Sequence, residues 1–161
     1  MATISALAGI IVAVAAYPII GIAMYASSVL IYDKFPEEFR GYPPDPEEKL
    51  LVRVQNNAPM SLPLINPFYT LHVVVEAEND AFAYFEGLGG KKRNFTEYSI
   101  DLGRIDSGDS EESTIILHVD ESDLTLRIDV YLWFGFQIKS SSATYSVEYL
   151  GDHEYAITKM G

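Results

Sequence analysis

The hydrophobic and polar positions divide the chain into two parts with different patterns. Residues 1–32 contain no Asp, Glu, Lys or Arg and consist almost entirely of apolar and small residues. A helix crosses the apolar core of a bilayer with about 20 such residues, each rising about 1.5 Å. The pattern therefore predicts a hydrophobic helix over residues 1–32, lying either in a bilayer or in a bundle of similar helices.

Small residues recur along this predicted helix and favour the close approach of a second helix. Pro18 removes one backbone hydrogen bond and is expected to bend the helix. The candidate packing positions are Ala6, Gly9, Ala13, Ala16 and Gly21.

Residues 1–32 allow two other interpretations. A cleaved signal peptide is disfavoured, because such peptides carry a basic n-region and an apolar stretch of only about 7 to 15 residues. A single-span anchor stays open, although no Lys or Arg precedes the helix to hold its N-terminus on the cytoplasmic side.

Residues 33–49 differ sharply from the segment before them. They hold four prolines together with several acidic residues. This composition is typical of an extended linker, and we expect it to space the following domain from the helix.

From residue 50 onward the apolar positions recur with a period of two, which indicates half-buried strands. Turn-forming sequences separate them, such as Asn-Asn-Ala-Pro at 56–59 and Gly-Leu-Gly-Gly at 87–90. About seven or eight strands without an intervening helix predict an antiparallel β-sandwich of immunoglobulin-like type over residues 50–161. The alternating runs are 50–55, 69–77, 98–102, 115–119, 124–138, 143–149 and 155–158.

The run at 124–138 is apolar on both sides. Tyr131 and Trp133 fall on the face opposite Leu132, Phe134 and Phe136. Either this strand is central and covered on both faces, or one face meets a partner. A covered strand is the preferred interpretation, and Tyr131 and Trp133 are the candidate interface residues of the other.

Charge and composition narrow the functional classes. All 11 Lys and Arg and all 23 Asp and Glu follow Tyr32, so the formal charge of −12 belongs to the second part of the chain. Such acidity repels phosphate backbones, which excludes nucleic-acid binding. The chain has no cysteine, which excludes disulfides, thiolate metal sites and cysteine nucleophiles.

Three histidines and two acidic loops were considered as metal sites. His72, His118 and His153 are scattered and form no metal-binding spacing, so they are interpreted as surface residues. The loops at 106–112 and 120–123 offer carboxylates but do not match the calcium-binding loop. We expect no metal and no other cofactor.

Catalytic motifs are also missing from the pattern. The glycines at 87–90 lack the spacing of a phosphate loop, and no serine lies in a nucleophile elbow. We therefore expect neither an enzyme nor a small-molecule substrate. Asn94-Phe95-Thr96 satisfies the N-glycosylation sequon, so Asn94 is a candidate glycan site on an extracellular domain.

The order of the two parts, an uncharged helix and then an acidic β-domain, resembles archaeal type IV pilins and archaellins. The resemblance implies a membrane-inserted precursor, a homo-oligomeric filament at the cell surface whose core is formed by residues 1–32, and a role in adhesion. The alternative is a single-span, membrane-anchored envelope protein or an accessory subunit of a membrane complex.

A second resemblance concerns the β-domain alone. The sequences LVRVQNNAPMSLPL at 51–64 and IDLGRIDSGDSEESTIILHV at 100–119 are similar to the opening and a later strand of late-embryogenesis-abundant type 2, or water-stress, domains. This resemblance implies a sandwich fold, which in archaea is often tethered to the membrane.

Overall fold

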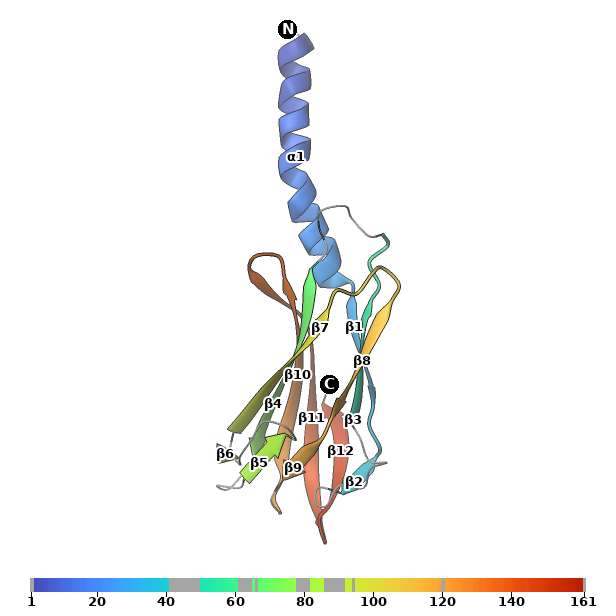
Figure 1. The fold of residues 1–161 in the computed structure, drawn as a ribbon, viewed down its shortest axis with the longest axis vertical. Coiled ribbons are helices and arrows are strands. Elements are labelled where there is room, and N and C mark those ends of the chain that lie inside the picture. The colour runs from blue at the N-terminus through green and yellow to red at the C-terminus, as the bar shows by residue number, and fades with distance from the viewer. Residues whose placement is uncertain are drawn as a thin grey trace.

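The computed structural model describes most of the chain and forms one helix and twelve strands within it. The helix, α1, comprises Ala2–Ser27, and its side chains are described only from residue 13 onward, residue 15 excepted. Figure 1 shows α1 standing out from one end of an elongated β-domain. The described residues are 2–40, 50–60, 65, 67–77, 82–85, 92–93, 95–119 and 121–160.

The strands follow the helix in chain order. They are β1 (Val29–Lys34), β2 (Glu38–Arg40), β3 (Leu50–Asn56), β4 (Phe68–Ala77), β5 (Phe82–Phe85), β6 (Lys92–Arg93), β7 (Phe95–Gly103), β8 (Ser110–Ile115), β9 (Leu117–Val119), β10 (Leu124–Trp133), β11 (Gln137–Gly151) and β12 (Glu154–Met160).

The strands build antiparallel sheets around one core. The largest sheet has the order β2-β12-β11-β10-β4-β7, and two smaller sheets have the orders β1-β3-β8 and β6-β5-β9. Only Ile116 separates β8 from β9, so the two smaller sheets follow one another along the chain at this point. The prediction of a helix followed by a mostly β, antiparallel domain is confirmed.

The period of two in the sequence explains how the sheets close on each other. In β3, Leu50, Val52 and Val54 are buried, whereas the residues between them are half-exposed. Leu126 and Ile128 of β10 are fully buried and belong to the same core cluster. Alternation along each strand therefore gives one face to the core and leaves the other to solvent.

Asn56 organises the turn that follows β3. Its buried side chain donates from Nδ2 to the carbonyl of Ile105 (2.9 Å) and accepts at Oδ1 from the amide of Ala58 (3.0 Å). Its backbone amide and carbonyl bond the loop at Asp109 and Gly108. An asparagine here satisfies backbone groups that the turn leaves without partners, and it ties two distant loops together.

The boundary between helix and β-domain differs from the prediction. The helix was predicted to continue to Tyr32 and a linker to cover 33–49, but α1 ends at Ser27 and Val29–Lys34 forms β1. β1 pairs with β3 over its whole length, and β2 adds an edge to the large sheet. Cross-strand pairing with β3 outweighs the helical tendency of this uncharged segment. The rest of the predicted linker, 41–49, lies outside the described residues.

The predicted single run at 124–138 is also corrected. It contains two strands, β10 and β11, which form an antiparallel hairpin. The turn between them is Phe134-Gly135-Phe136, in which Gly135 has a φ of 89°. Glycine adopts this left-handed conformation without a steric penalty, which explains why the chain reverses inside an apolar sequence.

Candidate functional site at the base of the helix

The helix is joined to the β-domain by a single residue, Ser28. The Ser28 hydroxyl donates to the carbonyl of Met24 (2.6 Å), and the Ser28 carbonyl accepts from the amide of Asn57 (2.8 Å). The hydroxyl of Ser140 in β11 donates to the carbonyl of Ala26 (2.7 Å). Carbonyls at the end of a helix lack partners within it, so these bonds both cap α1 and fix its direction.

The last turn of α1 belongs to the core of the β-domain. Tyr25 is only 1% exposed, and its ring centroid lies 6.3 Å from that of Phe134 in the β10–β11 turn. Phe134 in turn lies 6.3 Å from Phe136. The aromatic contact and the hydrogen bonds together make the helix and the β-domain one packed unit at their junction.

Farther from the junction the helix has an uncovered apolar surface. Val14 and Ile19 are each 69% exposed, and Ile20 and Tyr17 are also exposed. Adjacent exposed apolar side chains of this kind mark interaction surfaces more often than isolated ones do. Within the part of the chain that the structure describes, no helix has both the length and the hydropathy needed to span a membrane.

A pocket of about 380 Å³ lies where this helical surface meets the β-domain. One wall comes from Pro18 and Ile22 of α1, and the other comes from Phe68 at the start of β4 and from the tip of the β10–β11 hairpin. None of the described residues that line it carries a charge. These residues are Pro18, Ile22, Ile65, Phe68, Trp133, Phe134 and Gly135.

The predicted interface residues separate in the structure. β10 is central in its sheet and Leu132 is buried, but the other face is only partly covered. Tyr131 is half-buried beside His72, with ring centroids 5.9 Å apart. Trp133 is 51% exposed at the rim of the pocket. The preferred interpretation of a strand covered on both faces is therefore wrong at Trp133.

The predicted helix-packing residues also differ in whether a second helix can reach them. Ala13 is exposed and Ala16 half-buried, so both remain accessible to a second helix. Gly21 is buried one turn before Tyr25, on the face of α1 that meets the β-domain, and it is not free for such packing. Ala6 and Gly9 lie within α1, but their surroundings are outside the described part of the structure.

Sequence patterns did not indicate that Pro18 and Phe68 lie beside Trp133 in a pocket. In the sequence, Pro18 indicates only a bend in the helix, and Phe68 lies outside the alternating run that follows it. The one available signal was the excess of aromatic residues around Gly135. It indicated an apolar surface but could not place that surface beside α1, because this contact joins residues more than 100 positions apart.

A charged cluster occupies the outer face of the large sheet. Asp129, which is 1% exposed, accepts from Lys139 Nζ (2.7 Å), Arg127 Nε (3.2 Å) and Ser142 Oγ (2.5 Å). Burial raises the pKa of the Asp129 carboxyl, but the hydrogen bonds from Lys139 and Ser142 lower it more, so its pKa lies below the ordinary value. The buried carboxylate thus receives hydrogen bonds from all three side chains, and the cluster stabilises the sheet.

A second carboxylate connects the two layers at the open edge of β1. Asp33 Oδ2 accepts from the hydroxyl of Tyr145 in β11 (2.6 Å) and from Lys159 Nζ in β12 (2.6 Å). Burial and the neighbouring Asp33 carboxylate raise the pKa of the Tyr145 hydroxyl. An inward-pointing charge on an edge strand also discourages pairing with another chain along that edge.

The two histidines whose side chains the structure describes each lie beside a different glutamate. His72 Nε2 lies 3.5 Å from Glu97, and His153 Nδ1 lies 3.7 Å from Glu121. The side chain of His118 is outside the described residues, as is Asn94, the candidate glycan site. Over the described ranges, no three His, Cys, Asp or Glu side chains gather as metal ligands.

Comparison of the chain with protein-family models, curated proteins and solved structures gave no match.

Proposed function

We propose that this protein is a structural subunit of an extracellular filament, similar in architecture to archaeal type IV pilins, and that it assembles through α1. The observation that carries the proposal is the helix itself. It projects from the β-domain (Figure 1). Its apolar side chains Val14, Ile19 and Ile20 are exposed, while Tyr25 in its last turn is buried in the core.

Association of α1 with copies of itself would remove this surface from water. Each Å² of apolar area removed from water contributes about 25 cal/mol, so Val14, Ile19 and Ile20 favour burial against a partner. Small residues such as Ala13 allow the helices to approach closely. Apolar burial without charge therefore supports a core made of α1 helices.

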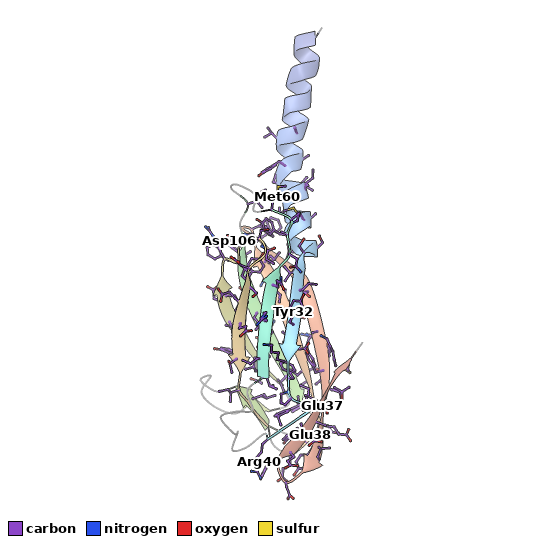
Figure 2. All side chains as sticks on the ribbon, turned by 90° about the vertical axis from the view of Figure 1, so that its right-hand side faces the viewer. Tyr32, Glu37, Glu38, Arg40, Met60 and Asp106 are labelled. Carbon is purple, nitrogen blue, oxygen red and sulfur yellow. The ribbon has the colours of Figure 1, made fainter. Side chains whose placement is uncertain are left out.

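The charges of the chain support an outer position for the β-domain. The formal charge of −12 lies entirely after residue 32, and like charges repel neighbouring domains unless water and salt separate them. In Figure 2, Glu37, Glu38 and Arg40 lie at the end of the β-domain remote from α1, whereas Met60 lies beside the base of the helix. A solvated acidic wall around an apolar core agrees with both features.

The immunoglobulin-like arrangement of the β-domain is part of this proposal. Its support is the antiparallel pairing of all strands and the single core shared by β3, β4 and β10. The similarity to water-stress domains has local support in Asn56, which begins the turn after β3 and holds the loop at 105–109.

The first test is electron microscopy of material sheared from the surface of the cells that produce the protein, with mass spectrometry of its main subunit. We expect helical filaments built from this chain. Recovery of the protein only from detergent-solubilised membranes, together with other subunits, would instead identify an anchored envelope protein.

A matched pair of variants connects the filament to α1. Ile20→Glu places a charge on the exposed face of the helix, and Leu150→Glu places one on an exposed apolar position of β11, at the end of the β-domain far from α1. We expect Ile20→Glu to abolish filaments and Leu150→Glu to leave them intact. Filaments of normal length from Ile20→Glu would contradict assembly through α1.

A further inference from the structure

The pocket at the base of α1 continues the exposed surface of the helix. Val14, Pro18 and Ile22 are spaced four residues apart and therefore lie on one face of α1. Pro18 and Ile22 line the pocket, and Val14 is exposed one turn above them. An apolar stripe thus runs along the helix and ends between α1 and the β10–β11 hairpin.

We propose that this pocket receives apolar side chains of α1 from a second copy of the chain. The proposal rests on the proposed function and adds to it a specific contact between the helix of one subunit and the β-domain of the next. Trp133 and Phe68 form the receiving wall, and Pro18 and Ile22 form the wall on the subunit's own helix.

Charge identifies the occupant. The described residues that line the pocket are all uncharged, although every charged residue of the chain follows residue 32. A carboxylate inserted there would lose hydration without meeting a charged side chain among the described lining residues, which is unfavourable. The Arg104 guanidinium near this wall already lies over the Phe68 ring, 4.7 Å from its centroid. Residues 1–32 are the longest segment of a second copy that brings no charge with it, and the next longest, 54–75, includes the end of β3 and most of β4. The neutral pocket and the neutral helix therefore match.

Size and shape agree with this occupant. An engineered apolar cavity of about 150 Å³ holds a benzene-sized group, so a pocket of 380 Å³ has room for two large side chains. Neighbouring positions on one face of a helix, three or four residues apart, supply two such side chains together. Trp133, half-exposed at the rim, would be covered by the incoming helix, as interface tryptophans commonly are.

Trp133 is the only tryptophan, so its fluorescence reports directly on the pocket. We expect its emission to shift to shorter wavelength and its quenching by acrylamide to fall several-fold when purified full-length chains assemble. The same samples are imaged by electron microscopy. Filaments whose tryptophan emission and quenching equal those of dispersed chains would overturn the proposed contact while leaving the filament function intact.

Disulfide mapping identifies the partner, because the chain has no cysteine of its own. Chains carrying Trp133→Cys or, as a second pocket position, Phe68→Cys are co-assembled with tagged chains carrying Val14→Cys, Ile19→Cys or Ile20→Cys, and are then oxidised. Each chain holds one cysteine, so a tagged heterodimer forms only between copies. Leu150→Cys, far from α1, is the matched control.

We expect heterodimers from at least one helix position with each pocket variant, and at least tenfold less with Leu150→Cys. Filaments that give no heterodimer with either pocket position would show that another surface covers the pocket. If wild-type chains never assemble, as judged by microscopy, the proposed function fails and this contact fails with it.

Discussion

The helix and the β-domain contain the same kinds of apolar residue, but these residues are buried in the β-domain and exposed on much of the helix. In the β-domain, apolar side chains such as Leu126 and Val54 are completely buried by neighbouring strands of the same chain. In α1, Ile19 and Ile20 are equally apolar but remain exposed. The difference is one of partners, because a single helix has no second layer to cover it.

This contrast shows which part of the chain buries its apolar side chains without a partner. The boundary falls inside α1, between Ile20, which is exposed, and Tyr25, which packs into the core. The last turn of α1 therefore forms part of the core of the β-domain. The exposed turns before it can be buried only by a partner outside the chain. Substitutions on the two sides of this boundary should therefore have different consequences.

The largest expected effect is on stability and lies in the core. Leu126→Ala leaves a cavity in the core of the β-domain and should lower the free energy of unfolding by about 2–5 kcal/mol. Ile20→Ala, on the exposed helix, should change it by no more than about 0.5 kcal/mol. Urea unfolding followed by Trp133 fluorescence measures both. Equal losses would mean that α1 is already buried within one chain.

The next effect tests the charged cluster on the outer face of the large sheet. Asp129→Asn removes a charged acceptor from Lys139, Arg127 and Ser142 and should lower the free energy of unfolding by about 1–3 kcal/mol at pH 7. Because the pKa of Asp129 is lowered by folding, its contribution is complete above the ordinary pKa of 3.8 and is lost as the pH falls through the folded value.

The difference between Asp129→Asn and the wild type should therefore shrink as the pH falls below 3.8. Urea unfolding of both proteins at pH 7 and pH 3 measures the change. A difference that stays constant over this range would show that the Asp129 charge does not stabilise the fold. Glu148→Gln, an exposed position on β11, serves as a control with little expected effect.

The smallest effects concern the two hairpin turns at opposite ends of the β-domain. Gly135→Ala forces a side chain into a left-handed conformation (φ 89°) and should cost about 1–2 kcal/mol. His153 already has a φ of 66°, so His153→Gly should relieve strain and raise the free energy of unfolding by about 0.5 kcal/mol. Thermal melts of the two variants measure these changes. A lower melting temperature for His153→Gly as well as for Gly135→Ala would show that His153 is not strained.

Strand positions were predictable where a buried face produces a clear alternation of apolar and polar residues. The runs at 50–55 and 69–77 correspond closely to β3 and β4, because a core on one side imposes a period of two. β1 was missed because Val29 and Ile31 continue the uncharged sequence of α1 without a turn signal. The hairpin at Gly135 was missed because its flanking residues are both phenylalanine.

The candidate site was predictable only in part. Trp133 could be selected because the run at 124–138 is apolar on both sides, and Ala13 because small residues recur along residues 1–32. Their surroundings could not, because the pocket depends on the direction in which α1 leaves the β-domain. That direction is set by hydrogen bonds such as the one from Ser140 to Ala26, which span 114 positions and leave no periodic signal.

The single-residue connection at Ser28 also determines how the molecule would respond to force. Tension applied along α1 passes directly into β1, which continues the chain toward the opposite end of the domain (Figure 1). All six residues of β1 are paired with β3, so a lengthwise pull loads these pairs together in shear instead of separating them one at a time. β1 therefore both receives the force from α1 and resists being pulled out of the sheet.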